Sequence, residues 1–427
     1  MPGADVAVVN DLTAYERIKK IIGKSKCKAV VVPKWISQSI DCWRAVLSTP
    51  KFLIFKKMKR QIRESNAKER TPVTSPKAKR KQEDINLSKW ECMRPTPDIC
   101  ENQNLVEALK VLQEQRYLIG EQMNSDAYAR AIASIKSYPN LIDNINQIKE
   151  LPNVGEKIHS LLIQFIETGK IIMVNQILNN ENYKILKLFC GIHGVGPTTA
   201  GKWLKEGHKT LEDVEKHVKL NNAQKIGLKY YHDFNELMTT EEAMDIFETI
   251  KKQILNLDEG FVVTAIGGLR RKKESHNDID ILVTHPKGLE CDLLDELIPL
   301  LTNKDIVVET IVHYDGNIGT SSSSDNHFDH FNKWYGVVKS PLTGKYRRLD
   351  LVMTTTKEYP FALLGWTGSK MFEKSIRRYA AEIKNCKLTS HHLLDLSKNE
   401  MVECQNEEEI FEYLGFPNFV QPEFRNC

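Results

Sequence analysis

The spacing of apolar residues divides most of the chain into a helical stretch followed by a stretch of strands. From Leu105, apolar side chains recur at i, i+4 and i+7 through Leu109 and Leu112, the period of an amphipathic helix. This texture continues to about Ile250. Beyond it, β-branched residues and apolar–polar alternation predict strands at FVVTAI (261–266), DIDILVT (278–284), DIVVETIVHY (305–314), WYGVVKS (334–340) and YRRLDLVMT (346–354). Helices followed by strands in this order predict an α+β protein.

The first 54 residues predict a small α/β unit of their own. Asp5–Asn10 and Cys27–Val32 are expected to form short strands, each followed by a helix. The segment VVVPKWISQSIDCWRAVLSTPKFLIF (30–55) resembles the second half of a BRCT domain, a module that binds phosphoproteins and other partners. The first half of that module is not recognisable, so we expect a partial or divergent unit.

Residues 55–97 predict a linker, because they are basic, contain proline and lack apolar periodicity. Between Lys56 and Lys81, eleven Lys and Arg stand against two Glu, a net charge of +9. The whole chain carries +4, so the remainder carries −5. Overall charge therefore does not establish nucleic-acid binding. The cluster KAKRK (77–81) fits either a nuclear-localisation signal or a solvated run of charge.

Composition excludes a membrane-spanning class and favours a reduced compartment. Hydrophobic residues make up 41% of the chain and charged residues 27%. No apolar run approaches the roughly 18 residues that a membrane helix needs. The nine cysteines form no CxxC pair, which is typical of reduced thiols in the cytosol or nucleus.

Two glycine-containing turns predict helix-hairpin-helix motifs. They are LPNVGEKI (151–158) and GIHGVGPTTA (191–200). In such a motif the tight turn lets backbone amides approach a DNA phosphate without reading the bases. One turn alone is more often an ordinary helix connection, but two in one chain favour binding of the DNA backbone through the turn residues Asn153, Gly155, Gly194 and Gly196.

Three aspartates on two predicted strands are candidate metal ligands. Side chains alternate along a strand, so Asp278 and Asp280 share one face of the first strand, and Asp350 lies on one face of the second. A lone D-x-D is more often a solvent-exposed strand face. A neighbouring strand that adds Asp350 would instead create a set of three carboxylates able to hold two Mg²⁺ ions.

The segment GGLRRKKESHND (267–278) leads into the D-x-D pair and ends at its first aspartate, Asp278. A strand that ends at Gly267 and Gly268 would let backbone amides and the arginines Arg270 and Arg271 face a polyanion. Basic loops are usually just solvated. Because the aspartates follow closely, Arg271 is expected to bind a triphosphate.

The pattern G-[GS]-x-R-R, a short loop and D-x-D is the nucleotidyltransferase signature of the X-family DNA polymerases, which this chain resembles over about residues 100–427. QKIGLKYYHDF (224–234), RRLDLV (347–352) and GWTGSKMFEKSIRRYA (365–380) match that family in order and spacing. FALLGWTGS (361–369) and HFDHFNKWYGVV (327–338) resemble its branch of polymerase mu and terminal transferase, whereas polymerases beta and lambda carry an aromatic residue in place of Gly365.

The resemblance implies a fold and a set of roles. The fold is α+β and multidomain: a helical lyase-like domain (98–175), a helical DNA-binding subdomain (176–260), a mixed-sheet palm (261–354) and an α+β nucleotide-selecting subdomain (355–427). Two Mg²⁺ ions, with Mn²⁺ as a substitute, would be held by Asp278, Asp280 and Asp350, and Asp350 would accept the primer hydroxyl proton. The residues implied to bind the nucleotide are Gly267, Gly268, Arg271, Asn277, Gly365, Trp366, Gly368, Lys370 and Glu373. Those implied to contact DNA, besides the turn residues, are Lys157 at a downstream 5′-phosphate, His327 at the primer end, Arg348, and Arg377 near the template.

The sequence also departs from the family. Leu161 occupies the position of the Schiff-base lysine of lyase-active members, so 5′-deoxyribose-phosphate lyase activity is expected to be weak or absent. Lys272 and His276 replace small residues in the loop before the aspartates and predict a stiffer loop. HYDGNIGTSSSSDN (313–326) is rich in Gly, Ser and Asn, which predicts a loop between strands. By resemblance that loop substitutes for missing template.

The resemblance implies a nuclear, monomeric DNA polymerase that fills gaps and extends joining ends with dNTPs in end joining and base excision repair. Because Gly365 has no side chain, weak sugar discrimination is expected. Possible partners through the N-terminal region are Ku and the end-joining ligase complex. The alternatives are a template-independent terminal transferase, an RNA-tailing nucleotidyltransferase, against which the two hairpins argue, and a non-catalytic scaffold that bridges DNA ends, against which the three aspartates and Arg271 argue.

Overall fold

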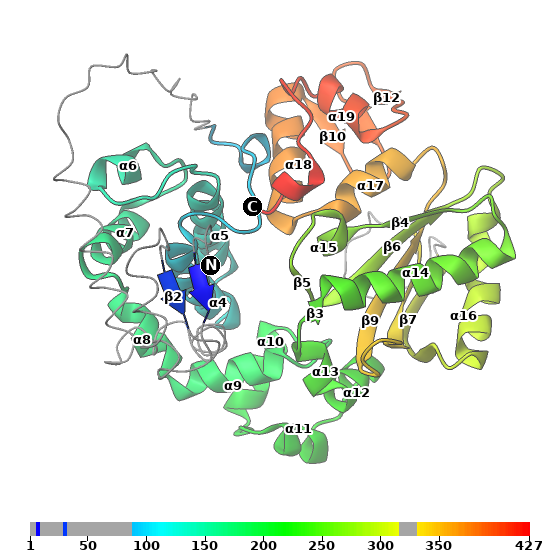
Figure 1. The fold of residues 1–427 in the computed structure, drawn as a ribbon, viewed down its shortest axis with the longest axis horizontal. Coiled ribbons are helices and arrows are strands. Elements are labelled where there is room, and N and C mark those ends of the chain that lie inside the picture. The colour runs from blue at the N-terminus through cyan, green and yellow to red at the C-terminus, as the bar shows by residue number, and fades with distance from the viewer. Residues whose placement is uncertain (1–5, 9–28, 32–87, 316–330) are drawn as a thin grey trace. The chain divides into compact units, whose positions relative to one another are not determined.

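The structure is a computed structural model that describes residues 6–8, 29–31, 88–315 and 331–427 (Figure 1). Two compact units divide the chain, 1–82 and 83–427. In the first, β1 (Val6–Val8) pairs in parallel with β2 (Ala29–Val31), which confirms the two predicted strands. The other predictions for residues 1–87, including the BRCT resemblance and the basic cluster, lie outside the described residues.

The second unit begins with a helical region whose core is built from the predicted periodic positions. Leu105, Leu109 and Leu112 on α4 are each at most 2% exposed and belong to one apolar cluster that extends through the following helices. Two helices, α4 and α5, pack against each other at its start. The helices are α4 (Gln103–Leu118), α5 (Gln122–Lys136), α6 (Ile145–Glu150), α7 (Glu156–Thr168), α8 (Ile172–Leu178), α9 (Glu181–Cys190), α10 (Pro197–Lys205), α11 (Leu211–His217), α12 (Asn222–Lys229) and α13 (Tyr231–Asn235).

A five-stranded mixed sheet follows, in the order β4-β6-β9-β8-β7. All five predicted strands form within a few residues of their expected bounds: β4 (Val262–Ala265), β6 (Asp278–Thr284), β7 (Val307–Asp315), β8 (Asn332–Lys339) and β9 (Tyr346–Met353). Two helices, α14 (Thr240–Leu257) and α16 (Leu293–Asn303), cover one face of the sheet. Their apolar residues cluster with Ile279, Ile281, Leu349 and Leu351, and Figure 1 shows α14 running across β6 and β9.

The chain ends in an α+β subdomain. It contains α17 (Tyr359–Thr367), α18 (Lys370–Lys384), α19 (Glu407–Tyr413) and an antiparallel sheet of β10 (Cys386–Leu388), β11 (Leu393–Asp395) and β12 (Glu400–Val402). The fully buried Phe372 and Ile376 of α18 pack with Phe411 of α19 in one apolar core.

Residues 88–97 form part of this last subdomain, which corrects the linker expected to extend to residue 97. Trp90 and Cys92 are buried in the same core as α18, and the Trp90 ring meets the Tyr379 ring edge-on at 5.4 Å. Thr96 pairs with Arg425 in an isolated parallel bridge. The sequence of this segment has no amphipathic period, so its burial could not be predicted. Its side chains are buried by residues that are distant in the sequence.

Across the described ranges, no single helix is long and apolar enough to cross a membrane. One bent pair, Glu156–Thr168 with Ile172–Leu178, passes that test by length and composition only, with a bend of 99° between its two helices.

Candidate active site

The three predicted aspartates lie side by side on the two central strands of the sheet. Because β6 and β9 are parallel neighbours, Asp280 is paired in register with Asp350, and Asp278 with Arg348. The intervening Ile279 and Leu349 are fully buried against α14 and α16. Alternation therefore places the carboxylates on the opposite face, as the sequence predicted.

Burial and mutual repulsion disfavour the ionised carboxylates in this site. Burial raises the pKa of Asp280 well above its usual range, and the charges of Asp278 and Asp350 raise it further. Burial also raises the pKa of Asp350 to about 7, against the lowering effect of Arg348. Carboxylates that repel each other in a poorly solvated place need protons or cations beside them.

An arginine takes the place of such a cation at Asp278. Arg348 donates from Nη2 to the Asp278 Oδ2 at 2.5 Å, and its Nη1 lies 3.3 Å from Nδ1 of His193. Burial, followed by the charge of Arg348, lowers the pKa of His193 to about 4. His193 is therefore neutral at physiological pH and belongs to the second glycine turn. Arg348 links the aspartates to that turn, a role that its sequence position did not indicate.

The aspartates match a divalent ion in chemistry but are not arranged around one. Within residues 88–315 and 331–427, no three His, Cys, Asp or Glu side chains form a group that could hold a metal ion. Asp278 is turned toward Arg348, with which it forms an ion pair. The residue types nevertheless suit the ion, because hard carboxylate oxygens are the ligands of Mg²⁺, and the register of β6 and β9 pairs Asp280 with Asp350. Binding would require Asp278 to leave Arg348.

The glycine pair before the aspartates begins a short helix, α15 (Gly267–Arg270), and does not end a strand as expected. Gly267 has a positive φ of 57°, and a Cβ there would lie 1.9 Å from Oδ2 of Asp280. Only glycine therefore fits beside this carboxylate. A Cβ at Gly268 would meet the Nδ1 of the buried His276 at 3.0 Å, whereas Asn277 is exposed directly before β6.

Two arginines of this loop reach the last subdomain. Arg271 donates from Nη1 to the Thr367 carbonyl and from Nε to Oδ1 of Asn426 at 3.0 Å. Burial lowers the pKa of Arg271, while the charge of Asp280 opposes that shift.

The neighbouring Arg270 binds Glu407 at 2.5 Å, and Glu407 also accepts from Arg425 at 2.8 Å. Sequence reasoning missed Asn426, Glu407 and Arg425, because they lie more than 130 residues beyond the loop.

The predicted sugar-binding residues lie at the junction of α17 and α18. Gly365 is inside α17, not in a turn, and a Cβ there would lie 3.2 Å from Oγ of Ser390 and 3.3 Å from Nη2 of Arg377. Trp366 is half-buried, with the Lys333 ammonium 5.8 Å from its ring. Gly368, joined to Ser369 by a cis peptide bond, has a φ of 69°.

The remaining predicted nucleotide residues differ in exposure. A Cβ at Gly368 would lie 3.0 Å from Nη1 of Arg271, so the two elements touch. Lys370 is exposed at the start of α18. Glu373 is 9% exposed, and burial raises its pKa to about 7. Nη2 of Arg377 lies 3.6 Å from Oε2 of Glu373.

The loop before β6 is held in place at Lys272 and His276, the two residues that differ from the family pattern. Lys272 has a positive φ of 54° and donates to Glu423 at 2.9 Å. His276 is 3% exposed, and its Nε2 lies 3.2 Å from the Thr240 hydroxyl.

Both glycine turns join two helices. The first connects α6 to α7, with Asn153 at φ 61° and Gly155 as N-cap; the second connects α9 to α10, with Gly194 at φ 82° and Gly196 as N-cap. The Asn153 amide donates to the Lys89 carbonyl and to Glu91.

The other predicted DNA contacts are more dispersed. Lys157 is exposed in the first turn of α7, whereas Leu161, on the same helix, is buried in the helical core. His327 lies outside the described residues. Of the predicted loop, residues 313–315 belong to β7, and residues 316–326 lie outside the described residues.

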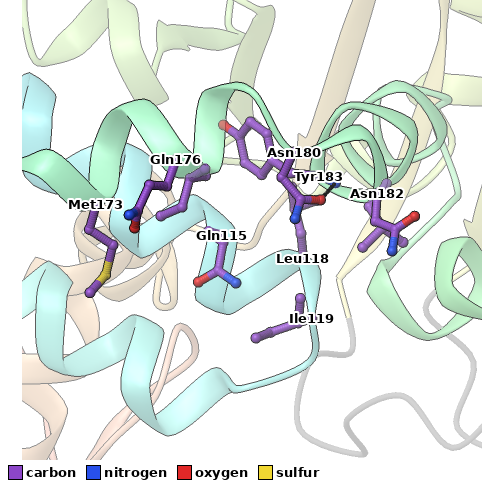
Figure 2. A pocket seen from close by; sticks show the side chains of 10 residues that line it. Gln115, Leu118, Ile119, Met173, Gln176, Asn180, Asn182 and Tyr183 are labelled. Atoms are coloured by element: carbon purple, nitrogen blue, oxygen red, sulfur yellow. Dashed lines mark hydrogen bonds between the residues drawn. The ribbon is translucent and has the colours of Figure 1, made fainter.

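Among the described residues, two cavities lie in or beside the helical region. One of about 690 Å³ lies between α4, α5 and the start of α18, and its lining includes Lys370, Lys374, Lys136 and Asn426. Two of its lining residues, Lys374 and Asp126, form an ion pair at 2.8 Å. Figure 2 shows the other, of about 310 Å³, in the helical region between α4, α8 and α9; none of the predicted site residues lines it.

Four family models match successive parts of the chain. They are a helix-hairpin-helix domain over residues 100–171, the fingers domain of DNA polymerase lambda over 187–235, the DNA polymerase beta palm over 238–356 and the DNA polymerase beta thumb over 362–426. The palm model spans the aspartates and the glycine–arginine loop, and the thumb model spans α18.

Curated relatives agree with these matches. A DNA nucleotidylexotransferase from Xenopus laevis is 33% identical over 366 residues, 80% of this chain and 72% of that protein. The DNA-directed DNA/RNA polymerase mu of Homo sapiens is 32% identical over 355 residues, 79% of this chain and 72% of that protein. A DNA nucleotidylexotransferase from Bos taurus is 28% identical over 440 residues, covering 98% of this chain and 84% of that protein.

Proposed function

This chain belongs to the X family of DNA polymerases, in the branch of polymerase mu and terminal transferase, and we propose that it is a DNA-directed DNA polymerase. The reaction is attack of a primer 3′-hydroxyl on the α-phosphate of a dNTP, with pyrophosphate leaving. The observation that carries this proposal is the registered pair Asp280–Asp350 beside Asp278. Such a set of carboxylates suits phosphoryl transfer.

Asp278, Asp280 and Asp350 would hold two Mg²⁺ ions. When bound, these ions would make the primer hydroxyl more acidic and stabilise charge on the leaving pyrophosphate. Asp350 would accept the hydroxyl proton, and the ion pair of Arg348 with Asp278 balances the charge of that carboxylate. Gly268, Arg271 and the backbone of Asn277 hold the triphosphate. The Gly365–Trp366 pair would lie beside the sugar, where Gly365 presents no side chain against a 2′-hydroxyl.

The two hairpin turns bind the DNA backbone on either side of a gap. Gly155 and Gly196 are the N-caps of helices that have no side-chain cap, so the N–H groups of each first turn can bind a phosphate, except at Pro197, which has no N–H. Lys157 is exposed beside the first of these turns, as a ligand of a downstream 5′-phosphate would be. Leu161 supplies no amine for Schiff-base chemistry, so gap filling proceeds without lyase activity.

The family supports a proposal for the biological setting. We place the enzyme in the nucleus as a monomer that fills short gaps in base excision repair and extends ends during non-homologous end joining. The N-terminal unit would contact Ku and the end-joining ligase complex. Template-independent extension is a second candidate activity, favoured because several of the relatives are named DNA nucleotidylexotransferases.

Primer extension on one-nucleotide gapped DNA with Mg²⁺ and dNTPs tests the proposal, with Asp280→Ala as the matched variant. The unmodified chain should insert the templated nucleotide. The variant should bind the same DNA with nearly unchanged affinity but extend on the order of a thousandfold more slowly, because it lacks a metal ligand. A single-stranded primer without template measures the second activity. Substantial extension by Asp280→Ala would refute the site assignment.

A further inference from the structure

We propose that Asn426 is a positioning residue that orients Arg271 for the triphosphate of the incoming nucleotide. This inference rests on the proposed function and adds a residue that no sequence motif indicated. Arg271 lies in the loop before the aspartates, and Asn426 lies 155 residues later in the sequence. Their contact joins the palm to the last subdomain beside the catalytic carboxylates.

The contact between the two side chains is reciprocal. Nε of Arg271 donates to Oδ1 of Asn426 at 3.0 Å, and Nδ2 of Asn426 donates back to the Arg271 carbonyl at 3.4 Å. The same Nδ2 donates to the Glu423 carbonyl at 2.9 Å. Both ends of the carboxamide are therefore engaged, and Asn426 is only 6% exposed. A buried amide with satisfied donors and acceptor has one preferred orientation.

The backbone of Asn426 is held from two further directions. Its N–H donates to the Thr96 carbonyl at 3.0 Å, and its carbonyl accepts from Nζ of Lys136 at 2.6 Å. Lys136 belongs to α5 of the helical region and is 8% exposed. Asn426 is thus fixed by the helical region and by the segment 88–97, and it transmits that position to the arginine.

These contacts fix the plane of the Arg271 guanidinium group. Asn426 holds Nε, and the Thr367 carbonyl, next to Gly368, holds Nη1. A guanidinium has five N–H donors, so those not used in these contacts can meet phosphate oxygens in a fixed direction. Asp280 is close enough for its charge to act on Arg271. The arginine is therefore held beside the carboxylates where pyrophosphate must leave.

The test measures nucleotide affinity in single-turnover extension of gapped DNA by the full chain. Asn426→Ala should weaken the apparent Kd for the dNTP about tenfold, the effect of losing hydrogen bonds that orient a charged group, and should change the maximal rate less. Asn426→Asp keeps an acceptor for Nε but has no donor for the Arg271 and Glu423 carbonyls, so it should recover only part of that affinity. The matched control is Asn102→Ala, which removes another buried asparagine whose carboxamide is engaged at both ends, but with Asn140 and Ile142 of the helical region; it should leave nucleotide affinity unchanged.

A double-mutant cycle separates positioning from a purely structural effect. If Asn426 acts through Arg271, then Asn426→Ala should have little further effect on dNTP affinity once Arg271→Ala is present. Full additivity of the two losses, or equal loss of DNA affinity and dNTP affinity, would overturn the inference. If Asn426→Ala does not fold, Asn426→Ser decides: dNTP affinity equal to that of the unmodified chain would overturn the inference, because serine lacks the carboxamide that makes both contacts with Arg271.

The outcomes distinguish the two proposals. An unmodified chain that fails to extend gapped DNA would refute the proposed function together with this inference. A chain that extends normally, and loses dNTP affinity with Arg271→Ala but not with Asn426→Ala, would refute the inference alone.

Discussion

Gly267→Ala is the substitution whose effect the structure determines most directly. The glycine has a φ of 57°, and an added Cβ would lie 1.9 Å from Oδ2 of Asp280. Van der Waals contact requires about 3.5 Å, so either the carboxylate or the loop must move by more than about 1 Å. Displacement of a catalytic group by about 1 Å typically costs around a hundredfold in rate. We therefore expect kcat/KM for gap filling to fall at least about a hundredfold.

A matched control separates this clash from backbone strain. Gly288 also has a positive φ, 76°, but an added Cβ there would meet nothing within 4 Å. Gly267→Ala and Gly288→Ala should each destabilise the fold by about 1–2 kcal/mol, the cost of an L-residue in the left-handed region. Only Gly267→Ala should lose activity.

The assays are primer extension on gapped DNA, DNA affinity, and chemical denaturation of both variants. DNA affinity should stay near that of the unmodified chain, because the hairpin turns lie on other elements. Gly267→Ala with activity within about tenfold of the unmodified chain would show that the loop adapts, and the predicted closeness to Asp280 would then be wrong. Equal loss in both variants would point to backbone strain instead.

Three further predictions concern other residues of the site. Ribonucleotide insertion should fall within roughly ten- to a hundredfold of deoxynucleotide insertion, and Gly365→Tyr should depress it selectively, with Gly365→Ala as the control for crowding of Ser390 and Arg377; rejection by about ten-thousandfold in the unmodified chain would place the sugar gate elsewhere. Borohydride should trap little or no enzyme on a 5′-deoxyribose-phosphate end, because Leu161 is buried among apolar residues and has no amine; strong trapping at any lysine would contradict this. Because burial raises the pKa of Glu373 from 4.5 to about 7, the folded state binds its proton more tightly than the unfolded state does, and stability should decline as pH rises from about 4.5 to 7. Glu373→Gln should therefore increase the free energy of unfolding more at pH 8 than at pH 5, by at most about 3 kcal/mol, and should raise the melting temperature more at pH 8. An equal rise in melting temperature at both pH values would refute the argument that Glu373 is a buried acid.

Local sequence patterns determined the elements that carry the site. Alternation along DIDILVT and YRRLDLV put the aspartates on one face of each strand, and β6 and β9 form with those faces as predicted. The glycine turns likewise join helices, with the left-handed backbone at Asn153 and Gly194. These features could be predicted because side-chain period and turn geometry depend on neighbours only a few residues away.

The tertiary structure decided which distant groups share the site. The sequence could not show that Arg348 neutralises Asp278, that residues 88–97 pack beneath α18, or that Asn426 meets Arg271. It also suggested a strand end at Gly267 where α15 begins, since a glycine pair fits either structure. By itself, the sequence determined the chemistry that each element can offer. The contacts that orient that chemistry join distant residues, 155 positions apart for Arg271 and Asn426 and 290 apart for Lys136 and Asn426. They depend on how whole elements pack, which no local pattern records.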